Sequence, residues 1–198
     1  MLKKIVQLIA SVVLAISLTA CGGGEIAPMA LVIGGGEIAH RNATEEPTLF
    51  EVLSSTQELE IIGSAPKTGQ TICDAPVSQI AARQPEFVVV TFGIEDSTKL
   101  SSEEFEDCLT AIYQAAFEAQ SILVITEATP VVDGGAWSQV YDATNVGAIE
   151  GKKRNWLGKY CQAPEVAADL VNFPDGVHPS ESVKKNIAQQ WVSCILRA

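Results

Sequence analysis

Short apolar runs alternate with longer amphipathic segments along most of this chain. Residues 87–92 (Phe-Val-Val-Val-Thr-Phe) and 121–126 (Ser-Ile-Leu-Val-Ile-Thr) are continuous and rich in β-branched side chains, which is typical of strands buried on both faces. Residues 31–33 form a shorter run that stops at three glycines, and residues 59–62 form a fourth that stops at Gly63. The pattern predicts four strands.

Amphipathic segments between and after these runs predict the helices. Ser101 and Glu104 have the spacing of a capping box, and the apolar residues that follow at helical spacing are Phe105, Cys108, Leu109, Ile112 and Ala116. A last helix from about Ser180 would carry on one face Val183, Ile187, Trp191, Cys194 and Ile195. A shorter helix is expected over residues 75–83.

The segment from residue 131 to residue 172 has no clean periodicity. We expect a helix within residues 138–150, a short strand near residues 156–161, and a solvated loop at Lys152-Lys153-Arg154. Strands that alternate with helices predict an α/β fold, with a mostly parallel sheet in a three-layer α/β/α arrangement. No repeat or composition shift indicates a second domain.

The first 20 residues have the pattern of a secretory signal. Lys3 and Lys4 precede an apolar run of about 14 residues, which is short of the roughly 20 that span a bilayer as a helix. Small residues then precede Cys21, and this ending resembles the lipobox of bacterial lipoproteins. The resemblance implies cleavage before Cys21, acylation of that cysteine (palmitate is a typical acyl chain) and a short tether over residues 21–29. An ordinary cleaved signal with an incidental cysteine is the alternative.

Gly22, rather than aspartate, follows the cysteine, which in Gram-negative lipoproteins implies export to the outer membrane, facing the periplasm or the cell surface. Removal of residues 1–20 takes away two lysines and changes the formal net charge from −11 to −13. An acidic surface argues against nucleic acid as a partner and disfavours contact with anionic headgroups. We therefore expect the lipid on Cys21, rather than the protein surface, to hold the chain on a membrane.

Four cysteines remain if Cys21 is acylated, and an even number in an oxidising compartment predicts two disulfides. Three pairings are possible. We favour the two that would join neighbouring elements of the predicted layout, which are Cys73–Cys108 and Cys161–Cys194. No metal site or other cofactor is expected, because the chain has no Cys-x-x-Cys and its only histidines are His40 and His178.

Candidate chemistry lies where the predicted strands end, since ligands of parallel α/β sheets gather at the carboxyl ends of the strands. Three segments have this position: residues 34–38, residues 93–96, and residues 175–179 ahead of the last helix. In the third, Asp175 precedes His178 by three residues, a spacing that lets a carboxylate orient an imidazole as in hydrolytic triads. A polar helix start, with both residues only capping, would give the same pattern.

Taken in order, these segments resemble the conserved blocks of the SGNH (GDSL-like) hydrolase family, whose members hydrolyse esters of lipids, sugars and other small acyl groups. That family has Gly-Asp-Ser after the first strand, a glycine after the second, Gly-x-Asn-Asp after the third and Asp-x-x-His before the last helix. Here residues 31–39 suit the first block, Gly69 the second, residues 92–96 the third and residues 175–180 the fourth. The resemblance covers nearly all of residues 30–198 and implies a flavodoxin-like arrangement in a single domain.

Two departures from the family pattern bear on activity. Glu37 stands where the nucleophilic serine belongs, or Gly36 if the alignment is shifted by one residue, and neither supplies a hydroxyl; Glu95 replaces the asparagine that donates to the oxyanion. Loss of the serine costs about 10⁶ in rate in subtilisin, and loss of one oxyanion donor costs about 10²–10³. Neither Ser64 nor Ser138 is placed convincingly as a replacement. An ion pair of His178 with Glu37 in the former nucleophile position is one hypothesis for the altered site.

Three functions follow as alternatives. The first is a degenerate hydrolase domain in the cell envelope that binds a small-molecule, acyl or glycan ligand, or a protein partner, without turning it over. The second is an esterase or acyl hydrolase in which Glu37 or His178 acts as general base on water. The third is a structural envelope protein that keeps the fold only as a scaffold.

Overall fold

The computed structural model describes residues 26–35, 38, 46–63, 65, 67–127, 132, 143–154 and 158–198. They form a five-stranded sheet in the order β2-β1-β3-β4-β5, in which every pair of neighbours is parallel. The strands are β1 (Met29–Gly34), β2 (Glu60–Ile62), β3 (Phe87–Thr91), β4 (Ile122–Thr126) and β5 (Lys159–Cys161). The predicted α/β fold is confirmed, and the order of the strands is the flavodoxin-like one.

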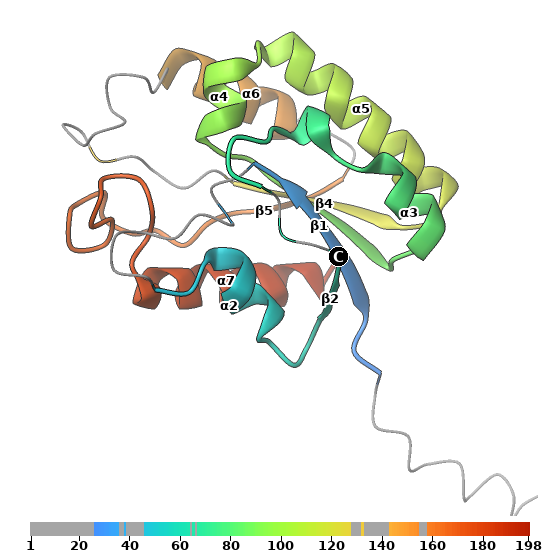
Figure 1. Ribbon diagram of the computed structural model, residues 1–198, viewed down its shortest axis with the longest axis horizontal. Coiled ribbons are helices and arrows are strands. Elements are labelled where there is room, and N and C mark those ends of the chain that lie inside the picture. The colour runs from blue at the N-terminus through green and yellow to red at the C-terminus, as the bar shows by residue number, and fades with distance from the viewer. Residues whose placement is uncertain are drawn as a thin grey trace, which may run out of the picture.

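Helices cover both faces of the sheet, so the molecule has three layers (Figure 1). On one face lie α2 (Leu49–Ser54) and α7 (Glu181–Ile195). The other face carries η2 (Ile72–Asp74), α3 (Val77–Arg83), α4 (Ile94–Lys99), α5 (Ser102–Glu118) and α6 (Ala143–Arg154).

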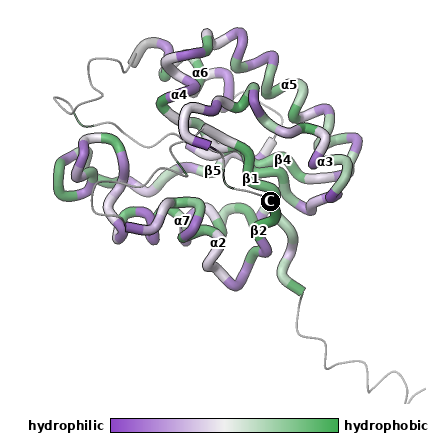
Figure 2. Tube along the Cα trace, in the orientation of Figure 1, coloured by the Kyte–Doolittle hydropathy of each residue, from purple (hydrophilic) through white to green (hydrophobic). Residues whose placement is uncertain are grey.

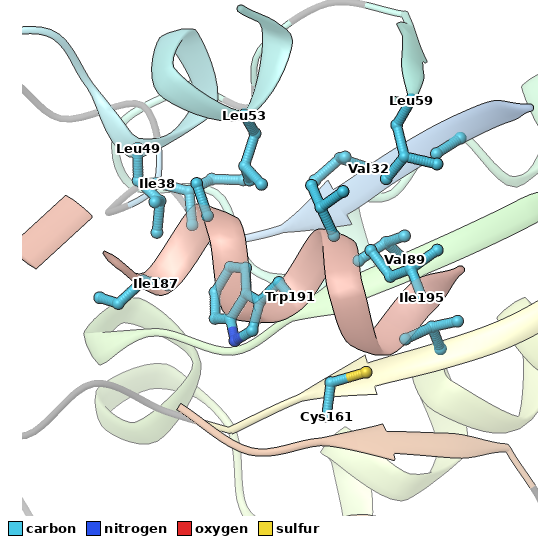
Figure 3. Close-up of a cluster of buried hydrophobic side chains, with 14 of the residues drawn as sticks. Val32, Ile38, Leu49, Leu53, Leu59, Val89, Cys161, Ile187, Trp191 and Ile195 are labelled. Atoms are coloured by element: carbon cyan, nitrogen blue, oxygen red, sulfur yellow. The ribbon is translucent and has the colours of Figure 1, made fainter. Parts of the chain in front are cut away.

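The central strands are apolar throughout because successive side chains point to opposite faces and both faces are covered. In β1, Ala30 and Val32 pack under α2 and α7, whereas Leu31 and Ile33 pack on the opposite side. Figure 3 shows the first of these cores, in which Trp191 of α7 is buried, as its helical spacing predicts. Each continuous apolar run therefore supplies alternate side chains to the two cores, one on each face of the sheet.

Both predicted disulfides are present. Cys73 of η2 is bonded to Cys108 of α5, and Cys161 of β5 is bonded to Cys194 of α7. The first bridge joins two helices on one face of the sheet, and the second joins α7 on the other face to the edge strand β5, so each outer layer contains one bridge. Closed loops of 35 and 33 residues restrict the unfolded chain, which stabilises the fold by about 3–4 kcal/mol each in the chain-entropy model.

The apolar periodicity of the sequence does not predict two of the short helices. The six-residue helix α2 follows Thr48, whose side chain accepts a hydrogen bond from the N–H of Glu51, and Glu51 in turn accepts one from the N–H of Thr48. The other is α4, which begins directly after Gly93. Neither is long enough to show a repeating apolar face, although Thr48 and Glu51 have the spacing of a capping box.

The basic cluster at residues 152–154 is not the solvated loop that its charge predicts. It forms the last turn of α6, and the side chain of Lys153 is only 1% exposed. Its Nζ lies 4.8 Å from the centre of the Phe92 ring and 5.9 Å from that of Tyr160. Aromatic faces and the aliphatic stem thus bury a cation that the local sequence places in water.

Several predictions fall outside the described residues: the signal peptide, Cys21, Glu37, Ser64 and Ser138. Among the residues that are described, no helix is long and apolar enough to cross a membrane. Figure 2 shows a hydrophobic stretch where β1 begins, at the end of the domain from which the N-terminal chain departs.

Candidate active site

The candidate site lies at the carboxyl edge of the sheet. The chain turns from β1 to β2 on one side and later returns to β3 on the other, so β1 and β3 flank a topological switch point. The two strands approach closely at their ends: a Cβ on Gly34 would lie 1.7 Å from Thr91 Oγ1. Only glycine allows this approach, which explains one of the three glycines that end the first apolar run.

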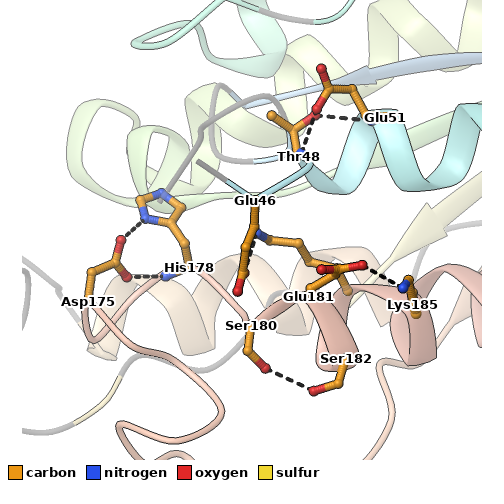
Figure 4. Close-up of polar contacts among 10 residues, drawn as sticks. Glu46, Thr48, Glu51, Asp175, His178, Ser180, Glu181, Ser182 and Lys185 are labelled. Carbon is orange, nitrogen blue, oxygen red and sulfur yellow. Dashed lines mark hydrogen bonds and ion pairs between the residues drawn. The ribbon is translucent and has the colours of Figure 1, made fainter. Parts of the chain in front are cut away.

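The loop before α7 carries the histidine corner, defined as residues 175–178. His178 Nδ1 lies 2.6 Å from Asp175 Oδ2 (Figure 4). The other carboxylate oxygen, Oδ1, accepts hydrogen bonds from the backbone N–H of Val177 (3.0 Å) and of His178 (2.7 Å). Since an ionised carboxylate only accepts, Nδ1 donates, and the lone pair of a neutral imidazole lies on Nε2.

Local chain geometry builds this corner. Gly176 has a φ of 83°, a left-handed conformation that glycine adopts without strain, and it folds the backbone back over Asp175. Its carbonyl accepts the N–H of Val132, and its own N–H donates to Phe173. The corner is thereby fixed on both sides, and the His178 side chain is only 6% exposed.

Hydrogen bonding sets the ionisation of Asp175. Burial alone would raise the pKa of its carboxyl group, but the N–H groups of His178 and Val177 and the imidazole hold that pKa below its usual value. Asp175 is therefore a carboxylate at neutral pH. Such a group can orient the imidazole and stabilise an imidazolium, which is the role of the acid in a hydrolytic triad.

Across the same edge of the sheet lies the glutamate corner, defined as Gly69, Glu95 and Asp96. The N–H of Gly69 donates to Glu95 Oε1 at 3.0 Å, and the carbonyl of Gly69 accepts from Lys99 Nζ at 2.5 Å. Gly69 has a φ of 83°, so a residue with a side chain would be strained there. The segments that resemble the second and third family blocks thus meet, and the backbone N–H of Gly69, the candidate oxyanion donor, is committed to a carboxylate.

Asp96 ties this corner to the rest of the fold. Its side chain is fully buried and accepts hydrogen bonds from the N–H of Ile72 (2.7 Å) and of Gly93 (3.0 Å). Burial raises the pKa of Asp96 to about 7, with a further contribution from the negative charge of Glu95, while the two N–H donors and the charge of Lys153 oppose the rise. Asp96 therefore joins the start of η2 to the start of α4.

Three buried charged residues near the site were not predicted to be buried from the sequence: Asp96, Lys153 and Lys184. Lys184, in the first turn of α7, is 1% exposed, and its Nζ lies 3.6 Å from Glu46 Oε2. Burial lowers the pKa of Lys184, against the opposing charges of Glu46, Asp175 and Glu181. Because none of these groups shows a local sequence signal for burial, only their neighbours in the fold identify them.

The predicted site residues thus form two bonded pairs, Asp175 with His178 and Gly69 with Glu95. Glu37, at the nucleophile position of the family, lies outside the described residues, and with it the hypothesis of a His178–Glu37 ion pair. In the part of the chain that the structure describes, no group of three or more histidine, cysteine or acidic residues is arranged to hold a metal ion.

Sheet order, layers and the two corners define a class: the chain has the SGNH/GDSL-like hydrolase fold. No protein-family model matches the sequence, and no curated protein matches it either. The evidence for the class is structural.

Similar solved structures come from three bacteria. An acetylxylan esterase from Geobacillus stearothermophilus has a TM-score of 0.61 at 13% identity, over 87% of this chain and 96% of that one. The esterase EstA from a Pseudoalteromonas species has a TM-score of 0.62 at 15% identity, over 86% and 97%. A protein from Desulfitobacterium hafniense assigned to the G-D-S-L lipolytic family has a TM-score of 0.63 at 17% identity, over 84% and 99%.

Proposed function

We propose that this chain is a lipid-anchored cell-envelope protein whose SGNH-like domain binds a ligand or partner without hydrolysing it. The anchor is the acylated Cys21 that the N-terminal sequence implies. The bound group occupies the carboxyl edge of the sheet, between the histidine corner and the glutamate corner.

The contact between Gly69 and Glu95 carries the proposal. An acyl-transfer site needs donors aimed at the oxygen that becomes negative in the transition state. Here the Gly69 N–H donates to Glu95 Oε1, and the resemblance aligns Glu95 with the donating asparagine of the family. A negative charge at this position repels a developing oxyanion, so the corner opposes the chemistry that the fold supports elsewhere.

The absence of a serine at residue 37 acts in the same direction. The histidine corner alone orients a base, but a base without a nucleophile or an oxyanion site has little to activate. We therefore assign Asp175 and His178 to ligand binding, because the carboxylate holds the buried imidazole in a fixed orientation.

Restoring the two missing groups tests the proposal. Full-length protein in detergent would be assayed with a short-chain chromogenic ester, as native protein and as the Glu37→Ser, Glu95→Asn and doubly substituted variants. We expect no turnover by the native protein and the largest rate in the double variant, with Glu37→Ser alone slower by about 10²–10³, the usual cost of one oxyanion donor.

His178→Ala in the double-variant background is the matched control and should abolish the gained activity. Glu95→Gln in place of Glu95→Asn removes the charge but keeps the length of the glutamate side chain, so it separates the effect of repulsion from that of donor placement. A folded double variant without turnover would show that residue 37 is not at the nucleophile position.

An active hydrolase is the second candidate, and the intact Asp175–His178 pair favours it. The solved structures named above include esterases, one of them acting on acetylxylan. Acetylated xylo-oligosaccharides are therefore suitable probes for both functions, by calorimetric binding and by acetate release. Acetate release by native protein that is lost in His178→Ala would replace binding with hydrolysis as the function.

A further inference from the structure

The two ends of the sheet differ in their exposed apolar side chains. Seven large hydrophobic residues are exposed among those described, and five of them lie at the amino end of the sheet: Ile26, Met29, Phe117, Ile122 and Leu196. Strands β1 and β4 begin there, and α5 and α7 end there, because the helices of a parallel sheet run back from its carboxyl end. The other two, Leu170 and Val171, lie in the loop between β5 and α7.

Four of these five residues line grooves, and the fifth, Leu196, follows directly after α7. Ile26 and Met29 line one open groove together with Pro85 and Ala119. Phe117 and Ile122 line a second groove, and Ser121 directly precedes Ile122 in the chain. The stacked rings of Tyr113 and Phe117, with centroids 6.3 Å apart, extend the second groove along α5. We call the five residues the amino-end apolar surface.

The same end carries the start of the tether. Five peptide steps separate Cys21 from Ile26, and such a stretch spans at most about 18 Å when fully extended. The candidate site lies at the far end of β1, whose six residues alone span about 20 Å, with the loops of both corners beyond. A tether of this length holds the amino end beside the bilayer and is too short to let the site turn to face it.

We propose that the amino-end apolar surface rests on a zwitterionic lipid bilayer and that the candidate site therefore faces away from the membrane. This inference rests on the lipid anchor of the proposed function and adds the orientation of the domain. It assigns the ligand to the aqueous side, as a soluble molecule or a glycan rather than a lipid of the anchoring membrane.

Charge favours apolar contact over attraction to anionic headgroups. Glu60 and Glu86 line the groove beside Ile26 and Met29, and Lys159 lines the groove beside Ile122. No basic cluster that would bind anionic lipid accompanies the surface in the described residues. The acyl chain supplies the affinity, and the exposed side chains, buried about 5–10 Å into the interface, fix the orientation.

Two variants of the full-length lipidated protein, each with one added free cysteine beside the two disulfides and the acylated Cys21, test the orientation. Phe117→Cys and Leu170→Cys replace apolar residues of similar exposure, 71% and 62%, at opposite ends of the sheet. Each would carry a fluorescent probe in phosphatidylcholine vesicles with or without brominated chains. We expect several-fold stronger quenching by brominated lipid at position 117 than at position 170.

Stronger quenching at position 170 would overturn the proposed orientation. Vesicle-bound protein with no quenching at either position would overturn it as well, and a protein partner or free rotation of the domain would then account for the exposed apolar side chains. Flotation of unlabelled native protein and of Cys21→Ala with the vesicles tests the anchor separately. If native protein fails to float, the anchor is wrong and the orientation falls with it, whereas flotation without quenching at position 117 leaves the anchor intact and refutes the orientation alone.

Discussion

The two corners of the candidate site each contain an aspartate, and the pKa values of these two residues are shifted in opposite directions. Asp175 accepts from two backbone N–H groups and an imidazole while partly exposed, and its pKa is lowered. Asp96 also accepts from two backbone N–H groups, but it is fully buried beside Glu95, and its pKa is raised to about 7. Two backbone N–H donors therefore accompany an ionised carboxylate at Asp175 but a carboxyl group that is half protonated near neutral pH at Asp96.

Solvent access and the neighbouring charge explain the difference. Water and an imidazole favour the charge on Asp175, whereas desolvation and a second carboxylate disfavour it on Asp96. The histidine corner therefore has the electrostatics of the acid–histidine pair of a hydrolytic triad, whereas the glutamate corner gathers negative charge. The two corners can differ in this way because separate loops build them, one before α7 and the other around η2 and α4.

Asp96→Asn should have the largest effect on this comparison. Since the folded-state pKa of about 7 exceeds the unfolded value of 3.8, the native state binds the proton more tightly. The free energy of unfolding therefore falls as pH rises from about 4 to 7, by up to about 4 kcal/mol, and asparagine abolishes that slope. Urea denaturation of both proteins over this pH range measures it.

Asp96→Asn also removes one hydrogen bond to the backbone. Its amide oxygen can accept from only one side, so one of the N–H groups of Ile72 and Gly93 loses its acceptor, at about 1–3 kcal/mol. The variant should be less stable than the native protein at pH 4 and approach or exceed it above pH 7. Parallel pH profiles for the two proteins would show that the raised pKa is wrong.

Asp175→Ala should have a smaller effect with the opposite dependence on pH. The lowered pKa means that Asp175 stabilises the fold above its unfolded pKa and loses this contribution as the pH falls through the folded value. Removal of the acceptor at neutral pH should cost about 1–3 kcal/mol, at the lower end because water reaches this loop. Asp175→Asn, which keeps an acceptor for the backbone N–H groups, should recover most of the loss.

The sign of the pH dependence distinguishes the two corners. The difference in unfolding free energy between native protein and Asp175→Ala should shrink below about pH 4, because the protonated native carboxyl no longer stabilises the loop. A difference that grows on acidification would mean that Asp175 is protonated in the native state and cannot orient His178 as proposed.

Much of the fold follows from local patterns in the sequence. Strands β3 and β4 are continuous β-branched runs, α5 begins at the predicted Ser101–Glu104 box, and α7 places Trp191 in the core. The disulfides were predictable because neighbouring elements in a βαβ layout are few. In contrast, α2 and α4 are too short to show periodicity.

The candidate site was predictable only in part, because its chemistry depends on contacts between distant segments. The Asp175–His178 spacing is local, and the structure places both residues as expected. Nothing local indicates that Lys153 is buried against Phe92, which is 61 positions away, or that Asp96 binds the N–H of Ile72. The family pattern aligned Glu95 with a donor, but the fold was needed to show that it accepts from Gly69.

Glu95→Gln should have the smallest effect and tests whether the two carboxylates of the glutamate corner are coupled. Glutamine keeps an oxygen that can accept from the Gly69 N–H but removes the negative charge that raises the pKa of Asp96. The pKa of Asp96 should therefore fall in this variant, though by less than burial raises it. The free energy of unfolding should begin to decrease at the same pH, which the unfolded pKa sets, but stop decreasing at a lower pH, which the folded pKa sets. Carboxyl chemical shifts of Asp96 during titration give the midpoint directly. Thr98→Ala is the control, because it removes a hydroxyl that hydrogen-bonds to the carbonyls of Ile94 and Glu95 in the same helix but leaves every charge in place. An unmoved midpoint in Glu95→Gln would show that burial alone raises the pKa of Asp96 and that the two corners differ in solvent access rather than in charge.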